Sequence, residues 1–84
     1  MRHLMTFDHS EEPGVSEPWE YSVFELETLG KVQLWFKQPN TPRWEMGHSK
    51  EVPLGATSFE VAETMRAFIC GTLSHESYNA LLPR

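Results

Sequence analysis

The fold is decided by residues 19–38, WEYSVFELETLGKVQLWFKQ, which predict a β-hairpin. Residues 20–27 and 31–38 are rich in β-branched and aromatic side chains, and a short turn segment that ends in glycine separates them. Alternation places Val32, Leu34 and Phe36 on one face of the second strand. The hairpin therefore supplies one apolar face on which a core can form.

The register of this hairpin follows from the length of its loop. A three-residue loop that ends at Gly30 pairs Leu26 with Val32 and Phe24 with Leu34, so that apolar side chains share a face. A two-residue loop would set Leu26 opposite a polar residue. Three-residue hairpin loops commonly end in a left-handed residue, and glycine adopts that conformation without strain. We therefore predict the three-residue register and a positive φ at Gly30.

A helix is predicted over residues 58–70. Thr57 and Glu60 form a capping box, with the threonine as N-cap and the glutamate at the third helical position. Gly71 is placed to end the helix in a left-handed cap, and Ser74 to cap a short C-terminal helix that packs through Tyr78. The apolar stripe of the main helix consists of Val61, Met65, Phe68, Ile69 and Leu73.

These elements predict an α+β fold in which a small antiparallel sheet packs against the helix. The hairpin at residues 20–38 is joined by one or two further strands, at residues 1–7 and 43–46, and residues 47–55 are expected to form a loop. The side chains expected to contact the helix from the hairpin are Phe24, Leu26, Leu34 and Phe36.

Composition limits the chain to one small domain, because it has 84 residues and a formal net charge of −5. The acidity is concentrated in residues 1–30, which carry seven acidic residues and one basic residue, and an acidic loop near residues 10–18 is expected to be mobile. Such a segment repels phosphate backbones, so direct nucleic-acid binding through a basic patch is disfavoured and a basic protein partner fits better.

Cysteine content and hydropathy point to a reducing compartment. Cys70 is the single cysteine, so no disulfide can form within the chain. The chain shows neither a signal-peptide pattern nor an apolar run long enough to span a membrane. We therefore expect a cytoplasmic protein.

No residue pattern in the sequence supports catalysis, a metal site or a cofactor. The four histidines are not spaced from one another or from Cys70 as structural zinc ligands are. Cys70 lies near the expected end of the helix, where the helix dipole disfavours a thiolate. We expect a non-enzymatic protein with no metal and no cofactor, and the histidines are assigned no role.

The aromatic residues supply the candidate site. Trp35 is expected on the hairpin face turned away from the helix, where an exposed aromatic patch with acidic neighbours would bind a protein partner. The predicted function is thus a small adaptor or inhibitor that binds a protein partner or a second copy of itself. The alternative is a nucleic-acid binder that stacks bases on Trp35, Tyr21 and Trp44. The predicted partner-binding residues are Tyr21, Val23, Glu25, Glu27, Trp35 and Lys37.

Overall fold

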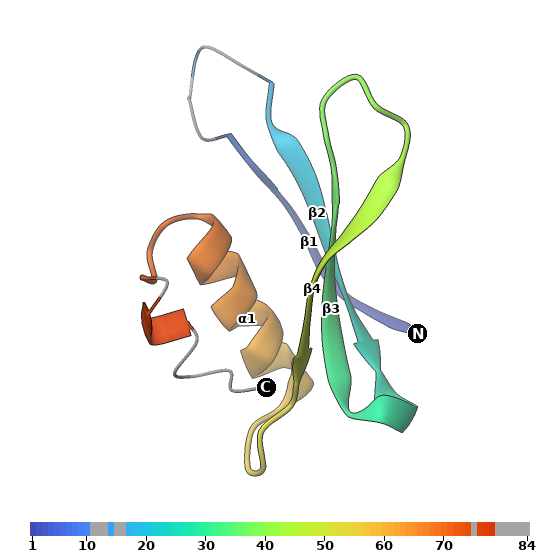
Figure 1. Cartoon of the computed structure of the whole chain (residues 1–84), viewed down its shortest axis with the longest axis vertical. Coiled ribbons are helices and arrows are strands. Elements are labelled where there is room, and N and C mark those ends of the chain that lie inside the picture. Colours follow the sequence, from blue (N-terminus) through green and yellow to red (C-terminus); the bar gives the residue numbers. More distant parts are fainter. Residues whose placement is uncertain (11–13, 15–16, 75, 79–84) are drawn as a thin grey trace.

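The computed structural model of the chain describes residues 1–10, 14, 17–74 and 76–78. Its elements are β1 (Arg2–His9), β2 (Trp19–Leu26), β3 (Lys31–Lys37), β4 (Trp44–Glu51) and α1 (Ser58–Ile69). The strands form one antiparallel sheet in the order β1-β2-β3-β4, and α1 packs across one face of it (Figure 1). The predicted α+β fold is confirmed. The acidic loop predicted near residues 10–18 includes residues 11–13 and 15–16, which lie outside the described residues.

The hairpin of β2 and β3 has a register that differs by one residue from the predicted one. Leu26 pairs with Lys31, and Val23 pairs with Leu34. Because side chains alternate along a strand, this slip places Val23 on the helix face and Phe24 on the opposite face. The prediction that Phe24 and Leu26 pack against the helix was therefore wrong, and its β3 half, Leu34 and Phe36, was right.

The turn between these strands explains the shift. It contains four residues, because a single 3-10 turn, Glu27–Leu29, precedes Gly30. Gly30 has a φ of +61°, and its amide donates to the Glu27 carbonyl at 3.3 Å. The predicted positive φ is thus confirmed, but it closes a loop one residue longer than the expected one.

The outer strands extend the sheet further than the sequence predicted. β4 continues through Glu51, so the loop expected from residue 47 was wrong over its first part. A bulge interrupts its pairing with β3 between Leu34 and Trp35, next to Gly47. A Cβ at Gly47 would lie 3.1 Å from the Phe36 ring, so glycine allows that ring to pack over β4.

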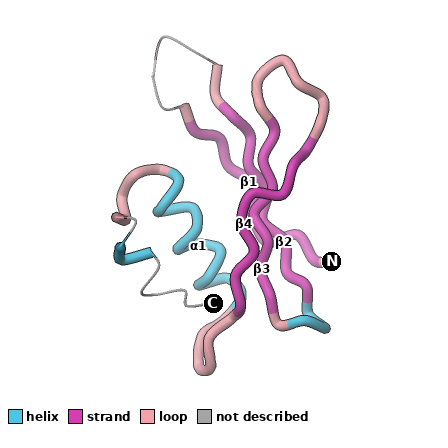
Figure 2. The backbone as a smooth tube through the Cα atoms, viewed as in Figure 1, coloured by secondary structure: helices cyan, strands magenta, loops and turns pink. Residues whose placement is uncertain are grey.

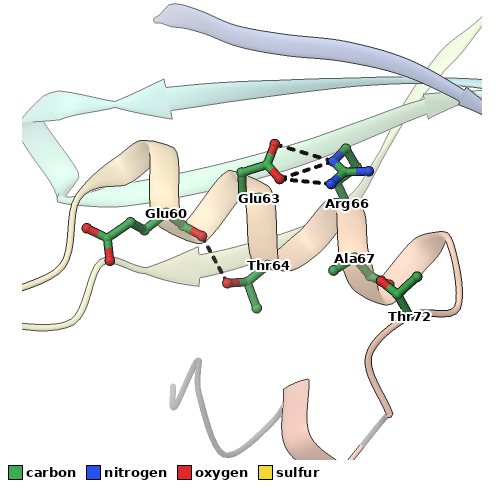
Figure 3. A network of polar contacts seen from close by, with 6 residues as sticks. All are labelled: Glu60, Glu63, Thr64, Arg66, Ala67 and Thr72. Atoms are coloured by element: carbon green, nitrogen blue, oxygen red, sulfur yellow. Dashed lines mark hydrogen bonds and ion pairs between the residues drawn. The ribbon is translucent and has the colours of Figure 1, made fainter.

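Helix α1 begins and ends at the predicted signals. The Thr57 hydroxyl accepts from the Glu60 amide at 3.1 Å and donates to the Glu60 carboxylate at 3.2 Å. At the other end Gly71 has a φ of +79°, and the Thr72 amide donates to the Ala67 carbonyl. The Gly71 amide also donates to the Phe68 carbonyl at 3.1 Å, and these two bonds form a Schellman cap. Figure 3 shows the outer surface of α1, where Arg66 pairs with Glu63 at 2.9 Å.

The core lies between α1 and the helix-facing side of the sheet (Figure 2). Val23, Val32, Ala62 and Met65 have no exposed surface. The buried residues of this core are Tyr21, Val23, Val32, Leu34, Val61, Ala62, Met65 and Tyr78.

Tyr78 packs into this core and so holds residues 76–78 against it. Ser74 caps the turn that carries it, as predicted, because its hydroxyl accepts from the Ser77 amide at 3.1 Å. The Tyr78 ring stacks on Phe68 with centroids 4.2 Å apart, and its hydroxyl shares a hydrogen bond of 2.8 Å with His48. Burial raises the pKa of the Tyr78 phenol to about 12. Residues 76–78 are helical, as predicted for the short C-terminal helix, and residues 79–84 lie outside the described residues.

Val23→Asp should destabilise the protein by at least about 3 kcal/mol, because it places an unpaired charge in the core. Phe24→Asp is the matched control. The Phe24 side chain lies on the opposite face of the sheet, so this variant should lose much less stability. Urea unfolding followed by circular dichroism measures both. The reverse order of stabilities would restore the three-residue register.

Gly30→Val should cost about 1–3 kcal/mol through its left-handed backbone alone. A Cβ at this position would meet no atom within 4 Å, so steric contact adds nothing. Gly30→Asn should cost less, because asparagine tolerates this conformation better than a β-branched residue does. Equal unfolding free energies for the two variants would contradict a backbone origin.

Stability should fall as the pH rises from 10 toward 12, because the Tyr78 pKa is raised from 10.0 to about 12 in the folded state. The folded protein holds the phenolic proton more tightly, so the stabilisation is complete below pH 10 and is lost above it. Tyr78→Phe removes the titrating group and should make this alkaline decline shallower. Identical alkaline unfolding profiles for the two proteins would show that Tyr78 ionises as it does in water.

Candidate functional site

The sheet has a second face that α1 does not cover. Among the described residues, α1 and the turn at residues 76–78 both lie on the core side of the sheet (Figure 1). We call the other side the open face. Pairing and alternation assign to it His3, Thr6, Asp8, Glu20, Ser22, Phe24, Leu26, Lys31, Gln33, Trp35, Lys37, Trp44, Met46, Ser49 and Glu51.

The centre of the open face is an apolar hollow. It has a volume of about 370 Å³ and is lined by Met1, Ser22, Phe24, Trp35 and Trp44. Trp44 is 38% exposed, and the Met46 side chain next to the hollow is 47% exposed. The exposed Trp44 and Met46 side chains therefore add apolar surface at this hollow.

Polar contacts hold the walls of this hollow in place. The Ser22 hydroxyl lies 3.2 Å from that of Thr6, which in turn is 2.6 Å from Nε2 of His3. The His3 ring meets the edge of Phe24 with centroids 5.4 Å apart. On the next strand the Trp35 indole N–H donates to the Gln33 side chain at 3.2 Å. Both aromatic walls are therefore positioned before any ligand arrives.

The rim of the open face carries charges of both signs. At one end Lys37 lies 3.7 Å from Glu20, and at the other Lys31 is the register partner of Glu51. Asp8 completes the set on the outer strand β1. Since the charges nearly balance, this face has neither a basic nor a strongly acidic field.

The structure separates the predicted partner-binding residues. Trp35 and Lys37 lie together on the open face, as expected for both. Tyr21 and Val23 lie in the core, 9% and 0% exposed, so the expectation that they share a face with Trp35 was wrong. The physical reason is the four-residue turn, which reverses the two faces of β2 relative to β3.

The two acidic residues of the predicted site also lie off the open face. Glu25 sits on the helix side with its side chain 13% exposed, paired with Arg2 at 2.7 Å. It also accepts a hydrogen bond from the Ser58 hydroxyl at the start of α1. Glu27 lies in the turn and reaches Arg2 at 3.9 Å. Glu25 therefore ties α1 to the sheet.

The rings proposed for base stacking do not form one platform. Trp35 and Trp44 line the same hollow, but Tyr21 stacks on Phe7 on the other side of the sheet with centroids 5.0 Å apart. Phe24, Met46 and Met1 take its place around the two tryptophans. The sequence contained a signal for this set, because Phe24 and Met46 lie on the same face of the sheet as Trp35 once the correct register is applied.

The histidines and Cys70 are dispersed through the fold. His3 contacts Thr6, His48 contacts Tyr78, and Cys70 is the partly buried C-cap of α1. His75 lies outside the described residues. Within the described part of the chain, no three His, Cys, Asp or Glu side chains gather where they could hold a metal ion. Nor does any described helix have the length and apolar character needed to cross a membrane.

Comparison with known proteins relates the chain to a phage protein. No curated protein and no solved structure matches it. The family model of the Mycobacterium phage L5 gene 74 protein matches residues 3–84, which include β2, β3, β4, α1 and all of β1 except Arg2. The open face and the core beneath it are thus parts of one family domain, and the chain belongs to the family of the Mycobacterium phage L5 gene 74 protein.

Proposed function

We propose that this phage-family protein is a small non-enzymatic module that binds a protein through the open face of its sheet. The observation that carries the proposal is the apolar hollow between Phe24, Trp35 and Trp44. It lies at the centre of the face, and charged pairs lie toward the ends of the strands.

This arrangement matches the anatomy of protein interfaces. Their centres are enriched in tryptophan, phenylalanine and methionine and are depleted in charge, whereas their rims are polar. Binding energy concentrates in a few such anchors, which exclude water when a partner covers them. Trp44 and Met46 are exposed beside the hollow, so a partner can reach them without any rearrangement of the sheet.

The chemistry of the hollow supports binding over catalysis. Its lining consists of aromatic rings, a thioether and one serine hydroxyl. That hydroxyl, on Ser22, is engaged with Thr6 at 3.2 Å. Such a surface offers shape and apolar area to a partner. An adaptor or inhibitor acting in the cytoplasm would need nothing more.

The open face favours a protein over a nucleic acid as its partner. Its two lysines are Lys31 and Lys37, of which Lys37 pairs with Glu20. Single-strand binding requires a positive groove that follows the phosphate backbone, together with stacking rings. The two tryptophans meet the second requirement, but the nearly balanced charge of the face disfavours the first.

Photo-crosslinking tests this proposal directly. With p-benzoylphenylalanine in place of Met46, irradiation of cells that make the protein should yield a covalent protein adduct identifiable by mass spectrometry. The same residue in place of Phe59, which is 54% exposed on α1, is the matched control and should yield no such adduct. Equal crosslinking from both positions would contradict a docking surface on the open face.

Trp44→Ala should weaken binding of the purified adduct partner by at least about 2 kcal/mol, or about 30-fold, as expected for an aromatic anchor that lines the hollow. Isothermal titration calorimetry measures this change. Phe59→Ala is the control, because it removes an exposed aromatic ring elsewhere and should leave the affinity unchanged. Wild-type affinity in the Trp44 variant would remove the hollow from the binding surface.

A further inference from the structure

We propose that a second copy of this chain occupies the open face, so that two sheets pack face to face in a symmetric dimer. This inference rests on the proposed function, since it names the partner of the same docking surface. Three features of the open face carry it: its area, the placement of its charges and the placement of its aromatic rings.

The area of the face lies close to the lower limit for a specific interface. Four strands spaced about 4.8 Å apart, each about seven residues long at about 3.3 Å per residue, span roughly 450 Å². Two such faces in contact bury roughly 900 Å² before the relief of the side chains is counted. Side chains that protrude from the sheet add buried area, which brings the total near the roughly 1,000 Å² that separates specific interfaces from incidental ones. We therefore expect a weak dimer that dissociates on dilution.

The charges select one of the two simple ways to stack the sheets. With the two-fold axis parallel to the strands, between β2 and β3, Glu20 of each copy lies over Lys37 of the other. With the axis across the strands, Lys37 lies instead near Lys31 of the second copy. The first arrangement alternates the signs of four charges and the second sets like charges together, so the parallel axis is favoured.

The same axis brings the aromatic rings together. Trp35 on β3 comes to lie over the β2 residues of the second copy, which include Ser22 and Phe24. Each hollow is lined by Phe24 and Trp35, so each copy contributes a ring to the other copy's hollow. Aligned packing of two twisted sheets at about 30° keeps these contacts near the axis.

Sedimentation equilibrium of the full chain tests the inference. From low micromolar to near-millimolar concentrations, the mass of the wild-type protein should rise from 9.7 kDa toward twice that value. Trp44→Glu should remain at the monomer mass throughout, because it places a charge beside the apolar hollow. Phe59→Glu makes the same chemical change on α1 and should associate as the wild type does.

A charge exchange tests the two-fold axis. Glu20→Lys should weaken association, because it sets two lysines against each other across the interface, and the combined Glu20→Lys, Lys37→Glu variant should restore it. Circular dichroism confirms that each variant is folded. The combined variant also restores the pair within each chain.

Several outcomes would overturn the inference. A wild-type mass that stays at 9.7 kDa over the whole range would exclude the dimer. Loss of association in Phe59→Glu would place the interface elsewhere, and failure of the charge exchange to restore association would exclude the parallel axis. A monomeric wild type that still crosslinks another protein through position 46 would overturn the dimer alone. If the wild-type protein neither associates with itself nor crosslinks another protein through position 46, the proposed function is overturned as well.

Discussion

The four-residue turn between β2 and β3 determines which side chains of β2 face α1. Both faces of β2 are apolar, with Tyr21 and Val23 on one and Phe24 and Leu26 on the other. Hydrophobicity alone therefore does not distinguish them. The 3-10 turn that ends in Gly30 aligns Val23 with Leu34, and every later contact of the core follows from that alignment.

Helix α1 depends on the same register through Glu25. This carboxylate lies at the end of the helix-facing side of β2, where it pairs with Arg2 and accepts from the Ser58 hydroxyl. A partly buried carboxylate is costly without partners, so these two groups make its position on the inner face acceptable. They also join β1, β2 and the first turn of α1 at one point. At the other end, Tyr78 joins the last described turn to β4 through His48 and to α1 through Phe68.

With its one long helix on one side, the sheet leaves Phe24, Trp35 and Trp44 around an open hollow. Helix α1, which has 12 residues, covers one face of the sheet. A domain of this size buries only about 60–65% of the surface that its unfolded chain exposes. The chain belongs to the family of the Mycobacterium phage L5 gene 74 protein, and the binding function and the dimer are proposals that rest on this surface.

The sequence by itself determined the local features of this protein. Thr57 with Glu60 and Gly71 predicted both ends of α1, because caps depend on residues within a single turn. The alternation of Val32, Leu34 and Phe36 likewise predicted the inner face of β3, since its other face is mixed with polar residues. The position of Trp35 away from the helix followed from the same alternation.

Only the tertiary structure decided which residues of β2 lie on the same face of the sheet as which residues of β3. Tyr21, Val23 and Glu25 were predicted beside Trp35 because the sequence permits a loop of three residues or of four, and one residue of difference exchanges the faces of β2. The extent of β4 was also beyond the sequence, because Gly47 is a strand breaker by propensity. It is tolerated in this sheet because the Phe36 ring packs over it at a bulge. The open face and its hollow arise from these two alignments, which cross-strand pairing and packing select among the turns and strand lengths that the sequence permits.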